Sequence, residues 1–136
     1  MIFIIFLYNK KMSDIGEIVL NFMFIRDQVK IYHWTTTSFA RHKASDSLVD
    51  SLTDKMDKFI ETIQGIHSKR LVIPKNKKIS FKNESDNSIV VLLENFKEWL
   101  TNTLPKYMKK NTDLINIRDD ILSDVNNTLY LFTFTR

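Results

Sequence analysis

The sequence predicts an all-α fold, a four-helix bundle with a long crossover between its second and third helices. Two glycines and two prolines among 136 residues leave long stretches without the residues that usually interrupt helices. Apolar residues in the first half recur at steps of three and four, the period of helices that bury one face. A stretch of about 18 residues without that period follows, and it can extend to about 60 Å, enough to cross a bundle lengthwise.

The composition narrows the class of protein. The chain contains no cysteine, which excludes a disulfide framework, a thiolate zinc finger and a thiol nucleophile. Its 43% of apolar residues suffice for the core of one domain. The net charge of +4 permits contact with nucleic acid without requiring it. The opening run MIFIIFLYNKK is too short to span a bilayer and lacks the flanks of a signal peptide, so we expect an intracellular protein with no membrane partner.

The chain divides into a short extension and the bundle. Residues 1–11 are expected to lie outside the bundle, because Ser13 and Asp14 are typical of a helix start. An added anchoring strand or a membrane-surface tail is the alternative for this extension. The bundle then covers residues 12–136, with helices over 14–36, 39–68, 87–104 and 113–132 and the crossover over 69–86.

The first two helices each carry a continuous apolar seam. In the first helix the seam consists of Ile15, Ile18, Phe22, Ile25, Val29 and Tyr32. In the second it consists of Val49, Leu52, Met56, Phe59, Ile63 and Ile66. The Thr and Ser residues at 35–38 interrupt the pattern and offer N-cap oxygens for the second helix. Because this connection is short, the two helices should be antiparallel neighbours.

The second half of the chain is expected to form the third and fourth helices. A long crossover lets the third helix run parallel to the second, which is the topology of ferritin-like bundles. Pro105 should end or kink the third helix, and Thr112 or Asp113 should cap the fourth. The acidic residues of these two helices are scattered, so no metal site is expected there.

Most of the residues that could bind a metal ion lie on the second helix. Five carboxylates, spaced by 4, 4, 3 and 4 residues, fall within an arc of roughly 80° on one helix face: Asp46, Asp50, Asp54, Asp57 and Glu61. His42 lies between the acidic edge and the apolar seam, and His33 flanks the seam of the first helix near its end. Imidazole nitrogens beside carboxylate oxygens are a donor set that suits a partly buried metal ion.

The order of these residues resembles the ferroxidase signature of Dps-type mini-ferritins. That family has a His-Trp near the end of its first helix, then H-x-x-x-D and D-x-x-x-E on the second. Here the matching residues are His33-Trp34, then His42 with Asp46, then Asp57 with Glu61. The interval from His33 to His42 is shorter than in the bacterial members. The amino-acid sequence from His33 to Ala44 is also similar to that of small ferritin-like proteins of phages and large viruses.

The resemblance implies an iron site that two subunits share. His33, His42 and Asp46 would come from one subunit, and Asp57 and Glu61 from its partner. Trp34 would then lie at their interface. The resemblance further implies Fe(II) oxidation by peroxide or oxygen and storage of the product in a homo-oligomer, at least a dimer and by family likeness a dodecamer. Zinc or manganese is the alternative metal.

Two other functions remain open on the sequence alone. The chain is alternatively a catalytically silent ferritin-like structural protein, for example a virion or nucleoid component. It is otherwise a basic helical protein that binds DNA non-specifically through its lysine clusters, for which Lys75, Lys77 and Lys78 are the first candidates.

Overall fold

The computed structural model describes residues 14–134 and is helical in all its regular structure. Its elements are α1 (Ile15–Thr35), α2 (Phe39–His67), α3 (Asp86–Glu98), the π-helix η2 (Trp99–Thr103), α4 (Pro105–Met108) and α5 (Thr112–Leu131). The predicted all-α bundle is therefore confirmed. The expectation for residues 1–11 lies outside the described residues.

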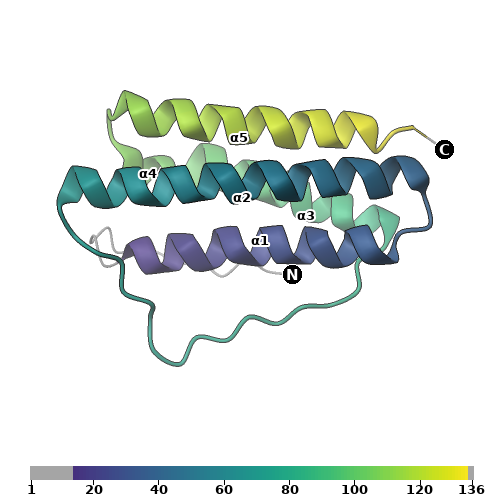
Figure 1. Cartoon of the computed structure of the whole chain (residues 1–136), viewed down its shortest axis with the longest axis horizontal. Helices are drawn as coiled ribbons and strands as arrows, with labels where there is room; N and C mark the ends of the chain where they lie inside the picture. The colour runs from purple at the N-terminus through teal and green to yellow at the C-terminus, as the bar shows by residue number, and fades with distance from the viewer. Residues whose placement is uncertain (1–13, 135–136) are drawn as a thin grey trace.

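The connectivity is that of a bundle with one long crossover. Figure 1 shows α1 and α2 antiparallel, joined by a tight connection at residues 36–38. From the end of α2 the chain passes back along the whole of α1 before α3 begins. As a result α3 runs parallel to α2, and α5 returns antiparallel to both (Figure 1). We call residues 68–85 the crossover from here on.

The region after α3 differs from the single helix over 87–104 that the apolar pattern predicts. At Trp99 the helix widens into a π-turn, in which the Leu104 N–H donates to the Trp99 carbonyl at 2.8 Å. Pro105 lacks an N–H and would leave an ordinary helix with an unpaired carbonyl, so it starts α4 at the first position instead. Lys109, with φ 52°, then ends this stretch before α5.

The core is centred on aromatic rings of α1, α2 and α3. Phe22 is fully buried and meets the rings of Phe59, Phe96 and Trp99 edge-on, at centroid distances of 5.7, 6.3 and 5.4 Å. Such edge-to-face pairs stabilise a core beyond the area that they bury. The seams of the first two helices thus meet as their spacing predicts, except for Ile66 at the end of the second seam, which is exposed.

The helix α1 is buried on more than its seam. Leu20, Asn21, Phe24 and Gln28 are also buried, although they point away from the seam. The crossover covers this second side, for example by stacking Phe81 on Phe24 at 6.0 Å. Helix α1 therefore has apolar residues nearly all round and little amphipathic character, as expected for a helix enclosed in protein.

Candidate functional site

The short connection between α1 and α2 brings His33 and His42 face to face. Ser38 caps α2 by accepting a hydrogen bond from the Arg41 N–H at 3.2 Å, which fixes the start of the helix. His33, in the last turn of α1, and His42, in the first turn of α2, then stack with ring centroids 4.0 Å apart and an interplanar angle of 17°. We call these two residues the histidine pair.

The two imidazoles hold each other in place through reciprocal hydrogen bonds. His33 Nδ1 lies 2.7 Å from the His42 carbonyl, and His42 Nδ1 lies 2.9 Å from the His33 carbonyl. Because a carbonyl only accepts, each Nδ1 must carry the proton and donate. In the neutral form of either ring, the Nε2 atom then keeps a lone pair that can bind a ligand. Metal-binding histidines are usually oriented in this way, by a hydrogen bond from the nitrogen that does not bind the metal.

Asp46 lies one turn beyond His42 and faces the same pair. Its Oδ1 is 3.7 Å from His33 Nε2 and 3.1 Å from the ammonium of Lys30. The hydrogen bond from Lys30 holds the pKa of Asp46 below its ordinary value, so this carboxylate is ionised at neutral pH. Both side chains of the Lys30–Asp46 pair are partly exposed. An approaching cation would thus compete with Lys30 for the carboxylate.

Ser45 and Lys30 belong to this site, although the sequence pattern did not single them out. Ser45 is fully buried, and its hydroxyl donates to the His42 carbonyl at 3.1 Å. Lys30 precedes His33 by three residues, and Ser45 follows His42 by three, so each shares a helix face with its histidine. Lys43, which the sequence places on the same helix face as Asp46 and could pair with it, lies over the ring of Phe39.

The two remaining signature carboxylates do not meet the histidine pair in one chain. Asp57 and Glu61 are exposed and follow Asp46 by 11 and 15 residues on α2, or by about 16 and 22 Å along the helix axis. Asp57 borders a hollow of about 300 Å³ between α1 and α2, with Arg26 and Asp54 beside it. Across residues 14–134, the His, Asp and Glu side chains of one chain form no group of three that could hold a metal ion.

Trp34 and Asp50 lie on the solvent side of the same region. Trp34 is 68% exposed, and the Lys30 ammonium lies 5.6 Å from the centre of its ring. Asp50 is exposed on the acidic face of α2, one turn beyond Asp46. Trp34 is therefore available for an interface, and its indole is close enough to Lys30 to report on the position of that side chain.

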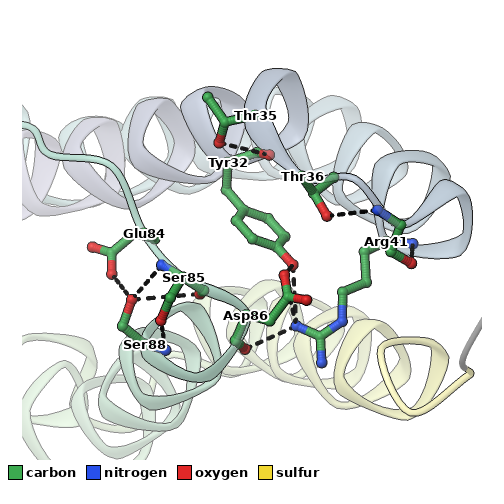
Figure 2. A network of polar contacts seen from close by, with 9 residues as sticks. Tyr32, Thr35, Thr36, Arg41, Glu84, Ser85, Asp86 and Ser88 are labelled. Atoms are coloured by element: carbon green, nitrogen blue, oxygen red, sulfur yellow. Dashed lines mark hydrogen bonds and ion pairs between the residues drawn. The ribbon is translucent and has the colours of Figure 1, made fainter.

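A second polar cluster at the same corner was not predicted from the sequence. Figure 2 shows the side chains of Tyr32 and Arg41 converging on Asp86. The Tyr32 hydroxyl donates to Asp86 Oδ1 at 2.5 Å, and Arg41 Nη1 donates to the Tyr32 hydroxyl at 3.1 Å and to the Asp86 carbonyl at 2.8 Å. We call these three residues the tyrosine network.

The tyrosine network connects four helices. Tyr32 ends the seam of α1, Arg41 lies in the first turn of α2, and Asp86 starts α3. The guanidinium of Arg41 also lies 4.8 Å from the ring centre of Phe132, at the end of α5. Burial of the phenol, with a contribution from the hydrogen bond to Asp86, raises the pKa of Tyr32 above its ordinary value. Asp86 lies 54 residues from Tyr32, a distance that no local pattern reveals.

Comparison with known proteins gives a family match. The model of a family described as "Family of unknown function (DUF5856)" matches residues 33–132, a span that begins at His33 and includes α2 to α5. No curated protein and no solved structure matches the chain. None of the helices within residues 14–134 combines the length and the apolar character needed to cross a membrane. Because the family match extends over well more than half of the 136 residues, the chain belongs to the family of unknown function DUF5856.

Proposed function

We propose that the protein binds Fe(II) at a site shared between two copies and oxidises it there with peroxide or oxygen, as a mini-ferritin. The observation that carries this proposal is the histidine pair. The Nδ1 atoms of both rings bond backbone carbonyls, and the Nε2 atom of His33 lies 3.7 Å from Asp46 Oδ1. The proposal also includes an intracellular location and storage of the oxidised iron in a closed oligomer.

The donor set fits iron. Imidazole and carboxylate together suit Fe(II), and zinc or manganese could also use these ligands. Iron is the substrate here, and each Fe(II) gives up one electron. Two such ions reduce one peroxide, which takes up two protons and leaves as two waters. Anionic carboxylates favour the Fe(III) product over Fe(II), because they neutralise its higher charge.

A second copy is needed to complete the site. The histidine pair and Asp46 lie near one end of the α1–α2 pair, while Asp57 and Glu61 lie further along α2. A twofold axis perpendicular to α2 would place the two copies of this helix antiparallel, so that Asp57 and Glu61 of one copy can face the histidine pair of the other. The hollow beside Asp57, lined by Val19, Met56 and Ile60 among others, offers an apolar surface for this contact.

The experiment compares four proteins after Fe(II) and peroxide are mixed, following the ferric absorbance. His42→Ala and Asp57→Ala should lose the fast phase, whereas Asp50→Ala, on the same acidic face but outside the signature, should keep it. Equal loss in Asp50→Ala would mean that the face acts only as diffuse negative charge. If all three variants match the wild type, there is no ferroxidase centre.

A mixing experiment tests whether the site is shared. His42→Ala and Asp57→Ala, each inactive alone, are unfolded together and refolded as a mixture. A mixed dimer has one site that lacks both groups and one that keeps both, so part of the fast phase should return. If activity does not return although mixed dimers form, the site does not lie between subunits.

A silent structural bundle is the second candidate, and a specific observation favours it. The reciprocal hydrogen bonds and the Lys30–Asp46 ion pair satisfy most polar groups of the corner without any metal. In that case the histidine pair serves only to lock α1 to α2, and the bundle is a structural component of a virion or nucleoid. Metal content of the purified protein separates the two functions.

A further inference from the structure

The crossover holds the positive charge of the chain. Residues 68–83 contain six of its twenty basic residues and none of its sixteen acidic ones, so the remainder has fourteen basic against sixteen acidic residues. The net charge of +4 therefore arises in this one segment. The six are Lys69, Arg70, Lys75, Lys77, Lys78 and Lys82.

The crossover is fixed to the bundle near both of its ends. The buried amide of Gln28 donates to the Lys82 carbonyl at 2.5 Å and accepts from the Lys82 N–H at 3.2 Å, as a neighbouring strand would. At the other end the Leu71 N–H donates to Gln64 Oε1 at 2.8 Å. Gly16 lets the backbone approach, because a Cβ there would lie 2.0 Å from the Val72 carbonyl oxygen. Loops of this length without regular structure are uncommon and often functional.

The basic side chains of this segment point to solvent. All six are exposed, and within residues 14–134 only Lys77 has an ion-pair partner, Glu17 at 2.9 Å. Asn76, with φ 61°, makes a turn in the middle of the segment. Figure 1 shows the crossover bending away from α1 before it returns to α3. The lysines around this turn are therefore the part of the crossover best placed to meet a large partner.

Apolar side chains are exposed among these cations. Val72 is 66%, Ile73 46% and Phe81 43% exposed. A nucleic-acid backbone would account for the lysines but would leave Val72 and Ile73 in water. The surface of an anionic bilayer accounts for both, since its headgroups attract lysines and its interfacial region takes up apolar side chains.

We propose that the crossover docks the bundle onto an anionic lipid surface, with its lysines on the headgroups and Val72 and Ile73 in the boundary between headgroups and acyl chains. The contact is peripheral, because the segment has neither the length nor the helical structure to cross a bilayer. It does not depend on iron chemistry. The sequence alone predicts no membrane partner, with a membrane-surface tail considered as an alternative only for residues 1–11.

Flotation with vesicles tests the proposal. The full chain is mixed with vesicles of phosphatidylcholine, with or without phosphatidylserine, and the variants are Lys75→Gln/Lys78→Gln and Val72→Ser/Ile73→Ser. Wild type should float only with phosphatidylserine. The lysine variant should bind at least about tenfold more weakly, since each lysine near the surface contributes about fivefold. The Val72→Ser/Ile73→Ser variant should also bind more weakly while keeping its helical circular dichroism.

The matched control is Lys106→Gln/Lys110→Gln, which removes the same charge from exposed positions outside the crossover. It should float nearly as well as wild type. Equal loss in this control would overturn the proposal, since only overall charge would then matter. Failure of the wild type to float would also overturn it, and retention on duplex DNA that is lost in Lys75→Gln/Lys78→Gln would then identify the crossover as a nucleic-acid surface.

Discussion

Two polar clusters at the α1–α2 corner are offset by a single residue in each helix. They differ in how many of their polar atoms have a hydrogen-bond partner. Tyr32 meets Arg41, and His33 meets His42, each pair nine residues apart. The tyrosine network extends to α3 and α5 and closes on itself through Asp86. The histidine pair closes only on the two backbone carbonyls and leaves a free nitrogen on each ring.

This difference separates a structural cluster from a candidate binding site. Every contact of the tyrosine network joins one helix to another, and its loss would leave the hydroxyl of the buried Tyr32 without a partner. In the histidine pair the hydrogen bonds orient the rings but use only the Nδ1 atom of each. Residue type alone does not distinguish the clusters, because both contain titratable side chains at the same corner.

The largest effect is expected from His33→Asn. The Asn amide can replace Nδ1 as the donor to the His42 carbonyl, but it removes the Nε2 atom, so the fold should persist while metal binding is lost. We expect the affinity for Zn(II), used as a redox-silent probe in calorimetry, to fall by about a hundredfold or more. Tyr32→Phe, one residue away, should leave this affinity unchanged. Equal loss in both variants would mean that the corner binds metal only through its overall structure.

Arg41→Ala is expected to lower the stability of the fold. This substitution removes two hydrogen bonds and the contact with Phe132, and should lower the free energy of unfolding by about 2 kcal/mol. His42→Asn should cost clearly less in the same urea titration. If Arg41→Ala is as stable as the wild type, the tyrosine network is not the structural cluster of the corner.

A smaller change is expected from Lys30→Gln. Without the ammonium beside Asp46, a divalent cation meets less repulsion, and its affinity should rise by about tenfold. Stability should change by less than about 0.5 kcal/mol, because the ion pair is partly exposed. Trp34 fluorescence offers a second measurement, since Lys30 lies near its ring. An unchanged affinity would show that Lys30 does not compete for the site.

The smallest effect is a dependence on alkaline pH. Because the folded-state pKa of Tyr32 is raised, its contribution to stability is fully present below its ordinary pKa of about 10 and is lost as the pH rises further. The melting temperature should therefore fall between about pH 9 and pH 11, and less so in Tyr32→Phe. Part of the fall should remain in that variant, because burial raises the pKa of Tyr107 to about 12. An identical fall in both proteins would contradict the assignment to Tyr32.

The helices, which depend on the local spacing of apolar residues, could be predicted from the sequence. Contacts between residues far apart in the chain could not. The seams of α1 and α2 and the length of the crossover predicted the helices and their connectivity. Gln28 could not be assigned, because its partner Lys82 is 54 residues away. For the histidine pair the spacing placed each ring near the seam, but only the turn at residues 36–38 determines that the rings stack. Whether Asp57 and Glu61 join them is a prediction about a second copy.

The attachment of the crossover to Gln28 has a consequence for the order of folding. Helices α1 and α2 can pair through a three-residue connection, whereas the Gln28–Lys82 contact must close a loop of 54 residues at a higher entropic cost. The α1–α2 hairpin should therefore form first, with Phe24 and Leu20 still exposed to water. Until the crossover docks, the newly made chain presents an apolar strip to its neighbours, and the speed of that docking limits how concentrated a refolding solution can be.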